Sequence, residues 1–173
     1  RAIEFYSKRA LMGGWDEEIY ISKYWIARLK ENLPNNVSDA EIINAYLEAW
    51  ESRPVRLEAL FHLVKFLENK KRYAFAFALA TIAMKSVPCT DVLFVEDEIW
   101  KWRMPDEYSV LAYYNGNPEE AFRITDSIVK SKIFESIPNI DKERITKNLG
   151  FYLDAMNKRK KEQIENSKIK EDI

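Results

Sequence analysis

Residues 57–90, LEALFHLVKFLENKKRYAFAFALATIAMKSVPCT, decide the fold of this chain. In their first half, apolar residues recur at the three- and four-residue spacing of a helix that buries one face. These positions are Leu57, Leu60, Phe61, Leu63, Val64 and Leu67. A polar break at residues 70–72 follows, and then an alanine-rich run from Tyr73 to Ser86 that Pro88 ends. The pattern predicts two helices joined by a short turn.

A weaker copy of this pattern occurs 34 residues earlier. Pro54 and Pro88 each end a predicted helix, and similar residues precede them at matching distances. The matched pairs are Ala49 with Ala83, Tyr46 with Ala80, and Ile42 with Ala76. This repetition resembles the tetratricopeptide repeat (TPR), a 34-residue helix pair. The resemblance covers about residues 1–131 and is best at 57–90, although Lys71 stands where the family has its turn glycine.

Further helix pairs are predicted on either side of the best repeat. A degenerate unit covers about residues 19–54. A third has Gly116 and Ala121 at the positions of the turn glycine and of a small residue. Residues 1–12 look like the second helix of an earlier pair, so we expect the chain to be a fragment of a longer protein.

The resemblance implies an all-α fold, a right-handed superhelical stack of antiparallel helix pairs with about eight helices. The low content of glycine and proline, 4 and 6 of 173 residues, also argues against many short strands. We expect one TPR-like domain over residues 1–153 with an irregular insertion at 89–104. Within it, residues 92–95 should form an apolar plug under the neighbouring helices, and Pro105 should kink or break the following helix. A charged tail at 154–173 is expected to be poorly ordered or a helical extension.

Composition and charge exclude several function classes. The 27 basic and 28 acidic side chains leave a net charge of −1, which provides no basic surface for nucleic acid or a membrane. No apolar run is long enough to span a bilayer. The single cysteine, Cys89, forms neither an internal disulfide nor a zinc site, which favours a cytoplasmic location.

A narrower resemblance concerns the helical-repeat region that follows family-2-type glycosyltransferase domains in some bacterial and viral proteins. Segments similar to that region are MGGWDEE (12–18), AYLEA (45–49), RP (53–54), LFVE (93–96) and NLGFYL (148–153). The resemblance implies that nucleotide-sugar chemistry belongs to an N-terminal domain outside these residues. The sequence has no Asp-x-Asp metal motif, so no transferase site is carried over.

Residues with chemical potential lack partners at a suitable spacing. His62 is the only histidine, and no second ligand accompanies it as a metal site requires. The tryptophans, Trp25 among them, are expected to pack between helices. The acidic residues at 16–18 and 119–120 begin helices, where the helix dipole explains them. We therefore predict no catalytic residue, no metal and no cofactor, and we do not expect the chain to be an enzyme.

Stacked helix pairs leave a concave face lined by the first helix of each pair. Such a face holds an extended peptide or a helix, and an exposed Phe61 among charges would suit this role. The candidate groove residues are Tyr20, Lys23, Glu58, Phe61, Lys65, Glu68, Asn69 and Tyr113. The leading hypothesis is a non-catalytic scaffold for protein–protein interaction.

Three alternatives stay open. The chain is an accessory C-terminal region of a glycosyltransferase, or an enzyme whose composite site near 89–104 uses Glu96 and Glu98. The third alternative is a dimerisation arm that binds a second copy of the chain. This arm would carry a large apolar patch near Trp15 or Trp100.

Overall fold

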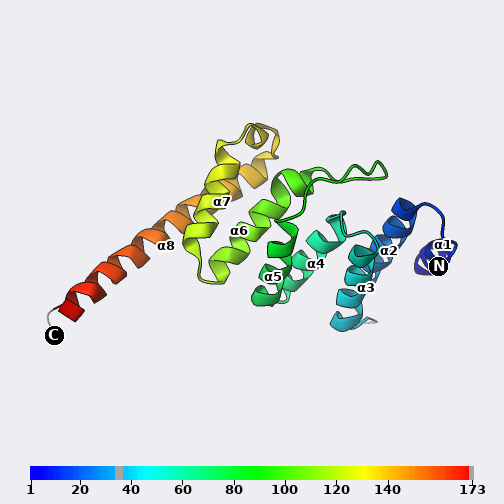
Figure 1. Cartoon of the computed structure of the whole chain (residues 1–173), viewed down its shortest axis with the longest axis horizontal. Coiled ribbons are helices and arrows are strands. Elements are labelled where there is room, and N and C mark those ends of the chain that lie inside the picture. The colour runs from blue at the N-terminus through cyan, green and yellow to red at the C-terminus, as the bar shows by residue number, and fades with distance from the viewer. Residues whose placement is uncertain (34–36, 172–173) are drawn as a thin grey trace. The chain divides into compact units, whose positions relative to one another are not determined.

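The computed structural model describes residues 1–33 and 37–171, with side chains as far as residue 163. Its α-helices are α1 (Ala2–Leu11), α2 (Asp16–Glu31), α3 (Asp39–Ser52), α4 (Glu58–Asn69), α5 (Tyr73–Ala83), α6 (Met104–Tyr114), α7 (Pro118–Lys130) and α8 (Asn139–Glu171). A π-helical turn, η1 (Ile99–Arg103), precedes α6, and a 3₁₀ turn, η2 (Lys132–Ser136), precedes α8. The described residues contain no strand (Figure 1), so the all-α prediction is confirmed.

Helices α1 to α4 each pack against the next helix along the chain, and α2 also contacts α4. This is the packing of a helical solenoid. The pairs α2/α3 and α4/α5 coincide with the two units predicted at 19–54 and 57–90. The predicted core positions of α4, such as Leu60 and Leu67, are fully buried. On α5 the small residues Ala76 and Ala80 are also fully buried.

Two turns between consecutive helices have a left-handed backbone. Gly116, between α6 and α7, has a φ of +79°. Lys71, between α4 and α5, has a φ of +58°. Because a side chain is strained in this region and glycine is not, position 71 has the geometry for which the repeat family uses glycine.

The helix that contains Pro105 is irregular in the turn that precedes this residue. The chain makes the π-helical turn η1 just before it and continues as α6 from Met104. A proline has no N–H to donate, and its ring excludes the carbonyl group four residues earlier. The widened π turn accompanies the proline without interrupting the helical path of the chain.

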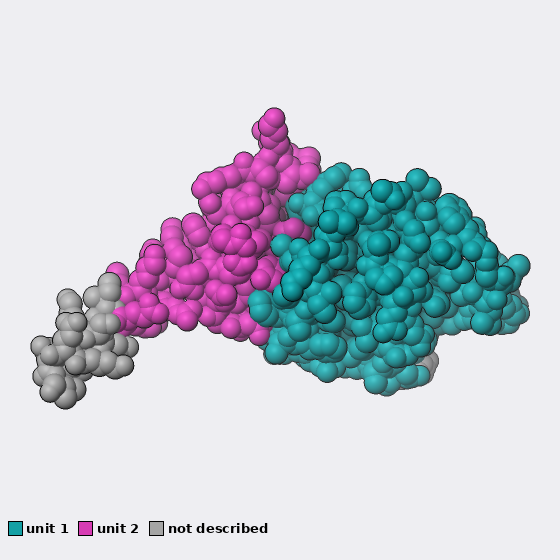
Figure 2. Space-filling view, in the orientation of Figure 1, with its two compact units in different colours: residues 1–104 teal, residues 105–173 magenta. Residues whose placement is uncertain are grey.

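The chain forms two compact units, residues 1–104 and residues 105–173 (Figure 2). The division falls inside the range predicted as one domain, residues 1–153. Helix α8 begins before the end of that range and continues past it to Glu171. Over 154–171 the tail is therefore a helical extension, and residues 172–173 lie outside the described part. No helix in the described residues has the length and apolarity needed to cross a membrane.

Candidate functional site

Three of the predicted groove residues do not lie on an exposed face. Tyr20, Glu58 and Phe61 are all buried, and Phe61 is only 4 % exposed. The expectation of an exposed Phe61 is wrong because the guanidinium group of Arg103 lies over its ring, 4.6 Å from the centroid. The structure therefore gives these three side chains internal partners.

The other predicted groove residues are more accessible. Lys23, Lys65 and Glu68 are half-buried, and Lys65 Nζ lies 2.7 Å from Glu68 Oε2. Asn69 is exposed at the end of α4. Tyr113 belongs to the other compact unit, where its ring lies 5.2 Å from that of Tyr152.

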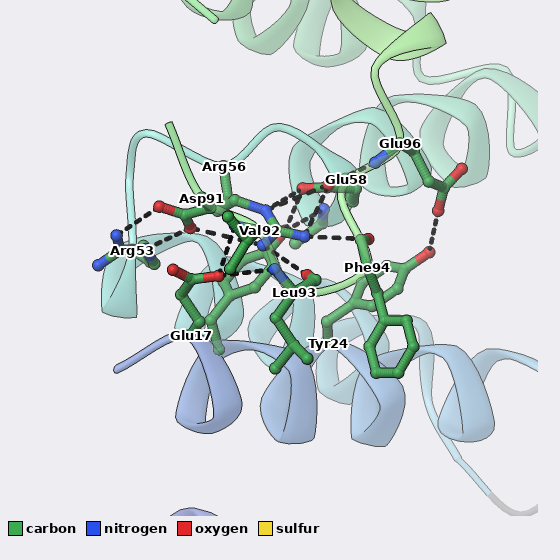
Figure 3. Close-up of polar contacts among 12 residues, drawn as sticks. Glu17, Tyr24, Arg53, Arg56, Glu58, Asp91, Val92, Leu93, Phe94 and Glu96 are labelled. Atoms are coloured by element: carbon green, nitrogen blue, oxygen red, sulfur yellow. Dashed lines mark hydrogen bonds and ion pairs between the residues drawn. The ribbon is translucent and has the colours of Figure 1, made fainter. Parts of the chain in front are cut away.

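Residues 91–96, which we call the strap, lie over α2 and α4 and are held there by charged side chains (Figure 3). From α2, Glu17 Oε2 accepts hydrogen bonds from the N–H groups of Val92 and Leu93, at 2.9 and 2.8 Å. From α4, Glu58 Oε1 accepts from the N–H group of Glu96 at 3.1 Å. These carboxylates satisfy the backbone of a segment that has no secondary structure of its own.

Arg56, just before α4, holds the strap from its carbonyl side. Its Nη1 and Nη2 donate to the carbonyl oxygens of Leu93 and Phe94, at 3.0 and 3.2 Å. The guanidinium group is fully buried, where an unpaired charge would be strongly destabilising. Glu58 supplies the counter-charge, with its Oε1 at 2.8 Å from Nη2. The ring of Tyr20 packs against the guanidinium group, 4.8 Å from centroid to Cζ.

Asp91 fixes the start of the strap. Its carboxylate pairs with Arg53 and lies 3.4 Å from Arg56 Nη1. The hydrogen bonds from Arg53 lower the pKa of Asp91 despite its burial. The strap is therefore anchored at its start by Asp91 and at its end by Glu96.

Beside the strap lies a hollow of about 400 Å³. It is lined by Tyr6 from α1, by Ile21, Tyr24 and Trp25 from α2, and by Phe94 and Glu96 from the strap. Its volume falls at the lower end of the range of ligand-binding clefts. The hollow is therefore a concave aromatic surface with one carboxylate.

Helix α1 brings Tyr6 to the hollow because a charged contact ties α1 to α2. Arg9 forms an ion pair with Glu18 and donates from Nη1 to the carbonyl oxygen of Gly13 at 2.9 Å. On α2, Tyr24 and Trp25 place their ring centroids 5.6 Å apart. Trp25 is 42 % exposed, which contradicts the expectation that it packs between helices.

Phe94 is held in an unfavourable backbone conformation. Its φ of +51° lies in the left-handed region, which a bulky residue rarely adopts. Its ring is nevertheless 73 % exposed, so burial does not offset the strain. The predicted apolar plug is therefore wrong at this position: the strap is fixed by polar contacts of its backbone, and the ring remains exposed. Strain of this kind clusters at functional sites.

Two titratable groups beside the hollow are neutral at pH 7. Burial raises the pKa of Tyr24, whose hydroxyl donates to Glu96 Oε1 at 3.4 Å. Burial, with the positive charges of Arg28 and Arg103, lowers the pKa of His62 to about 3. Arg28 Nη1 lies 2.8 Å from His62 Nδ1, so this nitrogen acts as the acceptor.

The residues weighed for catalysis lie in separate environments. Glu96 lines the hollow and pairs with Arg103 at 3.1 Å, whereas Glu98 is exposed and does not line it. Burial raises the pKa of the Cys89 thiol. In the part of the chain that the structure describes, no three His, Cys, Asp or Glu side chains are grouped as a metal ion would require.

No protein-family model, no curated protein and no solved structure matches this chain.

Proposed function

We propose that the chain is a non-catalytic, TPR-like helical-repeat scaffold that binds a segment of a partner protein at the hollow. The observation that carries the proposal is Phe94, whose exposed ring is held beside the hollow at positive φ by the buried Arg56. Exposed aromatic side chains in a concave site are typical anchors of protein interfaces. Paired helices that stack along the chain also support this function, because such arrays bind peptides on their faces.

The strap gives the proposed site its rigidity. Its backbone is bound by Glu17, Arg56 and Glu58, so Phe94 and Glu96 are positioned before a partner arrives. A preorganised site loses less conformational entropy on binding than a mobile loop does. The partner site therefore differs from the predicted groove, because Tyr20 and Glu58 are buried.

Selection of displayed peptides on the immobilised chain tests the proposal. Peptides enriched on the unaltered chain should bind at least about tenfold more weakly to Trp25→Ala and Phe94→Ala, because both lose an exposed aromatic anchor. Val92→Ala is the matched control, since Val92 is exposed on the same strap but does not line the hollow. The proposal is overturned when no peptide is enriched, or when the enriched peptides bind all of these chains equally.

A further inference from the structure

We propose that the hollow receives an arginine side chain of the partner, which stacks on its aromatic rings and pairs with Glu96. This inference rests on the proposed function and names the chemistry of the anchoring residue. The hollow combines four aromatic side chains with one carboxylate. Aromatic faces attract cations through their negative quadrupole, and a carboxylate supplies the complementary charge.

Glu96 has the capacity to accept a further donor. A carboxylate offers about four acceptor positions, and two of those on Glu96 receive the Tyr24 hydroxyl and Arg103 Nη1. The Glu96 side chain is 40 % exposed, so a group from solvent reaches it. A cation seated in the hollow therefore gains a charge-assisted hydrogen bond as well as ring contacts.

The same arrangement occurs twice inside this unit with the chain's own arginines. Arg56 lies over the Tyr20 ring and binds Glu58. Arg103 lies over the Phe61 ring and binds Glu96. Each site joins one guanidinium group, one ring and one carboxylate. The hollow presents the ring and carboxylate parts of this arrangement to solvent, with the exposed rings of Trp25 and Phe94 beside Glu96.

Arginine fits these features better than an apolar anchor or lysine does. An apolar side chain would desolvate the Glu96 carboxylate without replacing its hydrogen bonds to water. Lysine carries a strongly hydrated point charge, whereas the planar guanidinium group stacks on rings and forms parallel bonds to a carboxylate. The aromatic walls and the single acid at the hollow therefore favour a guanidinium group.

The test is titration of the intact chain with N-acetyl-arginine amide, monitored through the Trp25 indole N–H resonance. The uncharged isostere N-acetyl-citrulline amide is the matched probe. We expect a saturable shift with the arginine probe. The citrulline probe should bind at least about tenfold more weakly, because it lacks the positive charge and has an oxygen atom in place of one NH2 group of arginine. Glu96→Gln should weaken binding of the arginine probe by about tenfold, because it removes the carboxylate charge that pairs with the guanidinium group. Glu98→Gln, which removes an equal charge outside the hollow, should leave the affinity for the arginine probe unchanged.

The arginine inference is overturned if the two probes bind equally well. It is also overturned if Glu96→Gln leaves the affinity for the arginine probe unchanged, or if the arginine probe gives no saturable shift. If Glu96→Gln does not fold, Trp25→Ala replaces it as the test variant and should also bind the arginine probe more weakly. Because this variant lacks the Trp25 indole, its binding is measured from the resonances of the probe. The same comparison on the selected peptides separates the two proposals. Peptides that need Trp25 and Phe94 but tolerate citrulline in place of arginine support the scaffold and refute the arginine anchor. Peptides whose binding does not change in Trp25→Ala and Phe94→Ala refute both the scaffold proposal and the arginine inference.

Discussion

Arg56 and Glu58 form a buried ion pair whose two members also bind the strap. Both side chains are almost completely inaccessible, and their nitrogen and oxygen atoms lie 2.8 Å apart. Arg56 donates to two strap carbonyl groups, and Glu58 accepts from the N–H of Glu96. One pair thus connects the start of α4 with the segment that places Phe94 and Glu96 at the hollow.

Removing one member of this pair should be strongly destabilising. We expect Arg56→Met to lower the free energy of unfolding by about 3–5 kcal/mol, because it leaves the Glu58 carboxylate buried without a counter-charge. The double variant Arg56→Met, Glu58→Leu should recover part of this loss, since it buries no charge. Urea unfolding followed by circular dichroism measures both. An Arg56→Met chain as stable as the unaltered one would contradict the burial of this pair.

The stability of the fold should fall with acidification because of His62. Its pKa is about 3 in the folded chain and about 6.5 when unfolded, so below pH 6.5 the unfolded state binds a proton that the folded state does not. The free energy of unfolding should therefore fall as the pH drops from 6.5 towards 3, by up to about 1.4 kcal/mol per pH unit.

The single histidine makes this dependence assignable. His62→Gln retains an acceptor for Arg28 but does not titrate, so it should flatten the slope between pH 6.5 and 5. Urea unfolding at several pH values compares the two chains. A His62 ring that titrates in the folded protein with a midpoint near 6.5, as seen by NMR, would refute the prediction.

Lys71→Gly should stabilise the first unit. Lys71 adopts a φ of +58°, and glycine removes a strain of about 1 kcal/mol at such a position. Lys71→Ala is the matched control, because it shortens the side chain and keeps the Cβ that causes the strain. We expect a higher melting temperature for the glycine variant only. Equal melting temperatures of the two variants would show that the backbone at 71 is not strained.

Phe94→Gly should separate stability from binding. Glycine relieves the strain at a φ of +51°, so we expect the free energy of unfolding to rise by about 1 kcal/mol. The same variant loses the exposed ring, so selected peptides should bind at least about tenfold more weakly. Such opposite effects are typical of a residue retained for function. A loss of stability in Phe94→Gly would instead indicate that the ring serves packing.

The helices could be predicted from the sequence because their signals are local. The apolar spacing that begins at Leu57 places the buried face of α4, and the polar break near Lys71 places the turn. Pro105 likewise predicts an irregularity from its own chemistry. Each of these features depends on residues within a few positions of one another.

The hollow could not be predicted in this way because the strap depends on distant contacts. Glu17 is explained by the dipole of α2, yet in the structure it also accepts two N–H groups of the strap. Glu58 has the position of a groove residue, yet it is the buried partner of Arg56. Nothing in the periodicity indicates that residues 91–96 return to α2.

The contacts between the strap and Glu17 also imply an order of assembly. They join residues 75 and 76 positions apart, whereas the helix pairs form between neighbouring segments. Closing a longer loop loses more chain entropy, so local pairs form earlier than such contacts. During synthesis the hollow is thus completed only after Glu96 has left the ribosome, when α1 to α5 are already available as a platform. By the same reasoning, the amide hydrogens of the strap should exchange with solvent faster than those of α4. An opening confined to the strap would remove the hollow while the helices remain folded.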